Sequence, residues 1–103
     1  MPYDLVHMHQ AKMFLADMAK RYVALYAAQS ELASLDRAPR YLKLVRRLRT
    51  WLRQANFFWK GDHLTFLRAV AGYYSDYGAV LRLLKQEKDR GKFKPREELT
   101  QGA

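Results

Sequence analysis

The sequence predicts an all-α fold in which three long helices form an up-down-up antiparallel bundle. Apolar residues recur at intervals of three and four along most of the chain, which is the spacing of one face of a helix. Proline and glycine occur at only a few positions, and these divide the chain into three long segments. No segment alternates apolar and polar residues as a strand does. Half of the residues are hydrophobic, which is enough for a packed core.

The first helix is expected to begin at Asp4, a good N-cap, and to run to about Leu35. Its apolar positions follow in steps of three and four residues, as in a coiled coil or a long bundle helix. These positions are Met8, Ala11, Leu15, Met18, Tyr22, Leu25, Gln29 and Leu32. Pro39 marks the break after this helix, because proline suits the first turn of a helix and disfavours helix in the preceding residue.

The second helix is expected over residues 39–60, and Gly61 then ends it. The third is expected over residues 63–90, with Asp62 as its N-cap and Gly91 as its stop. Short connections make consecutive helices antiparallel neighbours. The predicted apolar seams are Tyr41, Val45, Leu48, Leu52, Ala55 and Trp59 in the second helix, and Leu67, Val70, Tyr74, Tyr77, Leu81 and Leu84 in the third.

Two glycines, Gly72 and Gly78, lie inside the third helix. Each lowers helix stability by up to ~1 kcal/mol relative to alanine, so their presence needs a reason. One interpretation is that they allow a neighbouring helix to approach closely. The other is a kink or a break near Gly72–Gly78, with Ser75 or Asp76 capping a new helix. We expect the continuous helix.

A chain of 103 residues corresponds to one domain. We expect residues 1–91 to form the helical bundle and residues 92–103 to form a polar, mobile tail. The start of the chain lacks the basic and apolar regions of a signal peptide. The longest run without Asp, Glu, Lys or Arg, residues 22–30, is far shorter than the ~20 residues of a membrane-spanning helix. There is no cysteine. Together these features predict a cytoplasmic protein.

Most of the positive charge lies in residues 37–60. The chain has a net charge of +9, and this segment contributes +8 because it holds eight basic residues and no acidic one. Six of them fall on the half of the second helix opposite its apolar seam, and one phenylalanine shares that half. These candidate nucleic-acid-binding residues are Arg40, Lys43, Arg46, Arg47, Arg49, Arg53 and Phe57.

This composition favours an anionic partner. Arginine forms paired hydrogen bonds with phosphate, and an exposed aromatic ring can stack on a base. We therefore expect binding of DNA or RNA, mainly through phosphates and not through base edges. A solvated basic face without a ligand, or one balanced by acids of neighbouring helices such as Asp17, Glu31 or Asp76, is the alternative. An acidic protein partner also fits. An anionic membrane surface fits less well, because the apolar side of this helix is needed to close the bundle.

The expected helix lengths also predict self-association. They place the end of the second helix level with about Ala16 of the first, so residues 4–14 would project past the bundle by ~15 Å. Uncovered apolar surface of that extent favours a homo-oligomer, most simply a twofold dimer. The alternative is that the first helix bends or starts later. The candidate self-association residues are Leu5, Val6, Met8, Met13 and Phe14.

We expect neither catalysis nor a bound cofactor or metal. The sequence has no glycine-rich phosphate loop, no paired carboxylates at a suitable spacing and no cysteine nucleophile. His7 and His9 diverge on a helix, and no Glu-x-x-His motif accompanies them or His63. The competing class of function is a self-associating interaction module, such as an adaptor, inhibitor or assembly factor, with an acidic protein partner.

Overall fold

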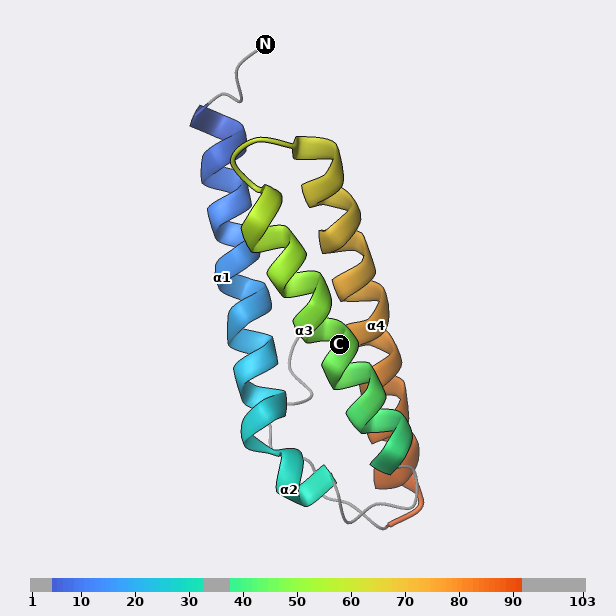
Figure 1. Cartoon of the computed structure of the whole chain (residues 1–103). Helices are drawn as coiled ribbons and strands as arrows, with labels where there is room; N and C mark the ends of the chain where they lie inside the picture. Colours follow the sequence, from blue (N-terminus) through green and yellow to red (C-terminus); the bar gives the residue numbers. More distant parts are fainter. Residues whose placement is uncertain (1–4, 33–37, 92–103) are drawn as a thin grey trace.

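The computed structural model describes residues 5–32 and 38–91, without the side chains of Leu5 and Leu32. Four helices make up this part of the chain: α1 (Leu5–Ala27), α2 (Gln29–Leu32), α3 (Ala38–Phe58) and α4 (His63–Asp89). The all-α prediction is confirmed (Figure 1). The predicted N-cap Asp4 and the predicted tail, residues 92–103, lie outside the described residues.

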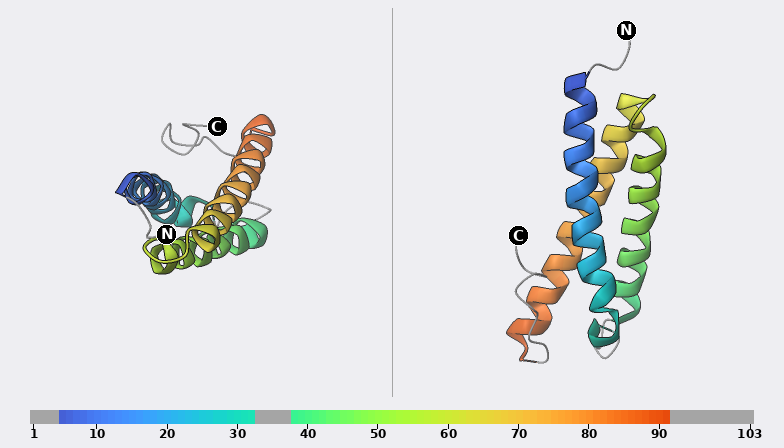
Figure 2. Two further views of the ribbon diagram at one scale, coloured as in Figure 1. Left: turned by 90° about the horizontal axis from the view of Figure 1, so that it is seen from above. Right: turned by 90° about the vertical axis from the view of Figure 1, so that its left-hand side faces the viewer.

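The three long helices run alternately down and up, and the short α2 turns beneath them (Figure 1). α3 and α4 form the most extensive contact, and α1 packs against α3. α1 and α4 run side by side at one end of the molecule and diverge toward the other (Figure 2). The three long helices therefore form a closely packed α3–α4 pair, and α1 packs against this pair mainly through α3.

The core agrees well with the predicted seams of the first two helices. Seven of those seam positions are buried, namely Ala11, Met18, Leu25, Tyr41, Val45, Leu48 and Ala55. The predicted seam of the third helix is confirmed only in part, since Val70, Tyr77 and Leu84 are buried. Leu67 is 39% exposed, whereas its neighbour Phe66 is buried, and the buried Tyr73 and Val80 likewise precede two predicted positions. α4 also buries two carboxylates, Asp76 and Glu87, which an apolar pattern does not count.

α1 ends about eight residues before the predicted end of the first helix. Ala28 interrupts the helix and is itself fully buried, and α2 adds a single turn. Eight residues fewer correspond to ~12 Å, so α3 and α4 reach the start of α1. The ring centroids of His7 and His63 lie 4.7 Å apart, and Lys12 Nζ lies 5.9 Å from the ring centroid of Trp59. The predicted overhang of residues 4–14 is therefore wrong.

The predicted ends of the third helix are confirmed. The backbone N–H of Thr65 donates to Asp62 Oδ1 at 3.0 Å, and its hydroxyl donates to Oδ2 at 2.7 Å. These bonds from Thr65 hold the pKa of the Asp62 carboxyl below its usual range. At the other end, Gly91 has a φ of 74°, the left-handed conformation that glycine adopts without strain after a helix.

α4 is continuous through both internal glycines, so no break occurs at Gly72–Gly78. A Cβ atom on Gly72 would lie only 2.5 Å from Cε2 of Trp51, which shows that the indole ring rests on the backbone of α4. A Cβ atom on Gly78 would meet only Arg82 Nη1, at 3.4 Å. Close helix approach thus explains Gly72 but not Gly78.

Candidate nucleic-acid interface

The outer side of α3 carries all the predicted nucleic-acid-binding residues, and each of them is exposed. Tyr41, Leu48 and Ala55, seven residues apart, face inward, so the intervening polar positions point to solvent. Phe57 is 80% exposed. We call the six cationic residues the basic face: Arg40, Lys43, Arg46, Arg47, Arg49 and Arg53.

The basic face consists of two rows with the same spacing. The first row lies on the flank of α3 that faces α4, since Arg47 bonds to a residue of α4. The second row lies roughly a third of a turn away around the helix. Members of each row are three and four residues apart, which places them on one side of the helix. The first row is Arg40, Lys43 and Arg47, and the second row is Arg46, Arg49 and Arg53.

The first row lines a hollow of about 450 Å³. Its described lining is Pro39, Arg40, Lys43, Leu44 and Arg47. Leu44 is buried and Pro39 is exposed, so two apolar side chains contribute to its wall. Three cations and an apolar surface therefore meet in one depression on α3.

Asp76 of α4 fixes the orientation of Arg47. Arg47 Nε donates to Asp76 Oδ2 at 3.0 Å, and Trp51 Nε1 donates to the same oxygen at 2.7 Å. Asp76 is buried, whereas the side chain of Arg47 is 53% exposed. Because a guanidinium has further N–H donors on its two terminal nitrogens, Arg47 keeps donors for an anion. The sequence indicated Asp76 as one of three acids that could balance the basic face, but it did not indicate the bond of Asp76 to Trp51.

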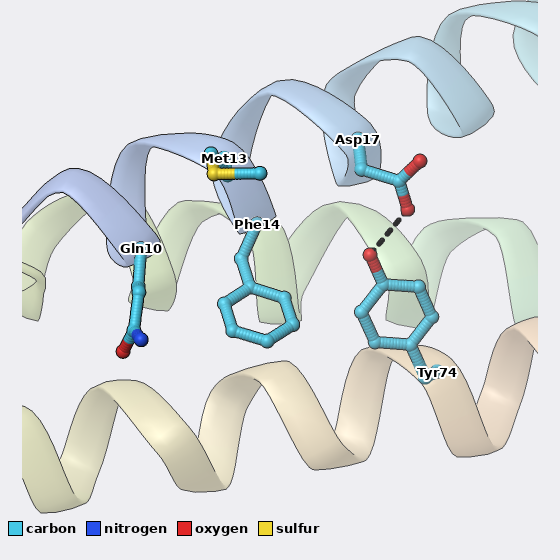
Figure 3. Close-up of a pocket in the computed structure, with 5 residues that line it drawn as sticks. All are labelled: Gln10, Met13, Phe14, Asp17 and Tyr74. Carbon is cyan, nitrogen blue, oxygen red and sulfur yellow. Dashed lines mark hydrogen bonds between the residues drawn. The ribbon is translucent and has the colours of Figure 1, made fainter. Parts of the chain in front are cut away.

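A second depression lies between α1 and α4 (Figure 3). It has a volume of about 550 Å³. Its lining is Gln10, Met13, Phe14 and Asp17 of α1 and Tyr74 of α4. Met13 is 61% exposed and Phe14 40% exposed, so its apolar wall is open to solvent.

Hydrogen bonds from two tyrosines cross the space between α1 and α4. Tyr74 donates its hydroxyl to Asp17 Oδ2, as Figure 3 shows, and Tyr73 donates to the carbonyl oxygen of Met18 at 2.6 Å. Burial raises the pKa of both tyrosines, and for Tyr74 the bond to Asp17 adds to it. Both hydroxyls therefore stay protonated and serve as donors at neutral pH.

Asp17 also accepts a bond from its own helix, from Arg21 Nε at 2.8 Å. Its partial burial acts to raise the pKa of the carboxyl, but the bonds from Arg21 and Tyr74 outweigh this and hold the pKa below its usual range. Asp17 thus forms an ion pair with Arg21 of its own helix. Of the acids that the sequence offered as partners for the basic face, Asp76 forms such a pair, with Arg47.

The predicted self-association residues keep an exposed apolar surface although the overhang is absent. Val6 is 64% exposed and lies seven residues before Met13, on the same side of α1. Phe14 contacts the rings of Phe66 and Tyr74, each with a centroid distance of 6.5 Å. Met8 is half-buried, and the side chain of Leu5 lies outside the described part.

Over residues 5–32 and 38–91, no three His, Cys, Asp or Glu side chains are grouped as metal ligands. The same part of the chain contains no helix with the length and apolar character needed to cross a membrane.

No family model matches this chain, and no curated protein or solved structure is significantly similar to it.

Proposed function

We propose that this protein binds nucleic acid, DNA or RNA, mainly through phosphate contacts from the basic face of α3. The observation that supports the proposal is the concentration of six exposed cations on one helix that contains no acid. Among the described residues, Arg47 is the only one of the six that pairs with a carboxylate.

Unpaired like charges three and four residues apart repel one another and lower helix stability. An anionic polymer removes this repulsion when it binds. From Arg40 to Arg53 the basic face extends over ~20 Å of helix. That length matches about six charges along one strand, at ~3.4 Å each. Phe57 follows at the end of the face, where its exposed ring is available for stacking on a base.

Fluorescence anisotropy of labelled duplex DNA and single-stranded RNA, at several salt concentrations, tests the proposal. The informative variant is the triple change Arg46→Glu, Arg49→Glu and Arg53→Glu, which leaves the ion pair of Arg47 with Asp76 intact. The matched control carries the same charge change elsewhere on the surface, at Lys20, Arg68 and Lys85. Circular dichroism establishes that both variants remain helical.

We expect binding that weakens steeply with salt, with a slope near −0.9 per phosphate contact on duplex DNA. The variant of the second row is expected to lose most of this affinity, and the control to keep most of it. Absence of binding at low salt, or equal losses in the two variants, would refute a dedicated phosphate-binding face.

The second candidate is a self-associating interaction module with an acidic protein partner. It is supported by the exposed apolar residues Val6, Met13 and Phe14 beside the depression between α1 and α4. In this case the basic face would meet carboxylates, whose binding depends on the geometry of the partner and not on a regular phosphate spacing.

A further inference from the structure

The two rows of the basic face differ in their surroundings, although their spacing is the same. The first row lines a hollow, and one of its members, Arg47, is bonded to Asp76 at the contact between α3 and α4. Arg46, Arg49 and Arg53 of the second row form no ion pair with a carboxylate among the described residues. Cations that line one hollow can converge on a single compact anion, such as a phosphate group.

The charge of the hollow points to a particular phosphate. Arg40, Lys43 and Arg47 supply three positive charges, and Asp76 offsets one of them. The remaining charge of about +2 complements a phosphomonoester, which carries ≈ −1.5 to −2 at neutral pH and has three acceptor oxygens. A phosphodiester within a strand carries a single charge. The hollow therefore matches a terminal phosphate better than an internal one.

Preorganisation supports the same assignment. Arg47 is held by Asp76, Asp76 also accepts a bond from Trp51, and Trp51 rests on Gly72. An arginine fixed in this way loses little conformational freedom when it binds an anion. Pro39 and Leu44 add an apolar wall of a kind that the sugar of a terminal nucleotide can contact.

We infer that the hollow binds the terminal phosphomonoester of a nucleic acid strand, and that the protein prefers phosphorylated ends. The inference rests on the proposed function, because the strand continues from the hollow along the second row. From Lys43 to Arg53 this path is ~15 Å long, or about four phosphate spacings.

The test compares single strands of one sequence that carry a 5′-phosphate, a 3′-phosphate or hydroxyl groups at both ends. Each strand is titrated against the wild type, the hollow variant Arg40→Gln/Lys43→Gln and the variant Arg49→Gln/Arg53→Gln. The two variants lose the same charge from the same helix. Far-ultraviolet circular dichroism checks that both keep their helical content.

We expect the wild type to bind one of the phosphorylated strands about tenfold more tightly than the hydroxyl strand, since charge-assisted hydrogen bonds to the terminal group are added. The hollow variant should lose this preference. The variant Arg49→Gln/Arg53→Gln should weaken binding of all strands and keep the preference.

Equal binding of all three strands by the wild type overturns the inference but leaves the proposed function in place. A preference that survives in the hollow variant also overturns it. Failure of every strand to bind refutes the proposed function itself. Adenosine monophosphate serves as a competitor: if it displaces the phosphorylated strand with the affinity of that strand, the ligand is a mononucleotide and not a strand end.

Discussion

Asp76 joins the exposed face of α3 to the buried contact between α3 and α4, because one of its oxygens accepts bonds from both Arg47 and Trp51. Arg47 is half exposed, so its terminal N–H groups are free to meet water or a phosphate while Nε stays bonded to this carboxylate. The indole N–H has no such freedom while its ring rests on Gly72. The carboxylate of Asp76 therefore satisfies the indole N–H of the packed Trp51 and orients the side chain of Arg47.

Replacement of Asp76 with alanine should lower the free energy of unfolding by about 1–3 kcal/mol, since it leaves the indole N–H without its acceptor. Asp76→Asn keeps an acceptor oxygen at this position and should cost less. Urea denaturation followed by circular dichroism measures both changes. A fully stable Asp76→Ala variant would show that the bond to Trp51 contributes nothing.

Asp17 should make a pH-dependent contribution to stability. Its pKa is lower in the folded protein than in the unfolded chain, so its stabilising effect is complete above the unfolded value of about 3.9 and disappears as the pH falls through the folded value. The side chain is 41% exposed, and solvent screening limits the effect to about 0.5–1 kcal/mol. Asp17→Asn should be less stable than the wild type at pH 7, and the difference should shrink below about pH 4. The same difference at both pH values in urea titrations would contradict this linkage.

At the scale of the helices, the α3–α4 pair depends on the absence of a side chain at one position of α4. Arg47 and Trp51 are one turn apart on α3, as are Gly72 and Asp76 on α4, and the two pairs meet in antiparallel register. The sequence indicated that close packing could explain a glycine here. It could not distinguish Gly72 from Gly78, because only the register shows which of them faces an aromatic ring.

Gly72→Ala and Gly78→Ala form a matched pair, since alanine favours a helix by up to ~1 kcal/mol in both. At Gly78 the new methyl group meets only the end of a flexible arginine, so this variant should be more stable than the wild type. At Gly72 it would overlap the Trp51 ring, and overpacking of about 1–3 kcal/mol should exceed the gain. Thermal unfolding should rank Gly78→Ala above the wild type and Gly72→Ala below it; the reverse order would exclude the close contact.

At the scale of the whole molecule, α1 leaves apolar side chains exposed near the end where it lies beside α4. Self-association through this surface remains a prediction, and sedimentation velocity over a range of concentrations tests it. A dimer is expected, and Val6→Gln/Met13→Gln should shift it to the monomer. Val23→Gln changes a residue that is as exposed as Val6 on another side of α1 and should leave the dimer intact. A monodisperse wild-type monomer at high concentration would rule out this surface as a dimer interface.

The fold class, the cap at Asp62 and the stop at Gly91 could be predicted because each depends on residues close together in the sequence. The basic face could be located for the same reason, since it lies on a single helix. The end of α1 at Ala27 could not be predicted, because the apolar spacing continues past it. The hollow and the contact of His7 with His63 depend on how the helices meet, which periodicity within one helix does not determine.

The bond from Trp51 to Asp76 also makes the intrinsic fluorescence of Trp51 sensitive to changes at Arg47. The indole shares a carboxylate oxygen with Arg47, so its emission depends on the electric field of that ion pair. An anion bound to the terminal N–H groups of the guanidinium would alter this field while the ring remains fixed against α4. Events on the outer face of α3 would then be visible in the near-ultraviolet spectrum of the native chain, without an attached dye.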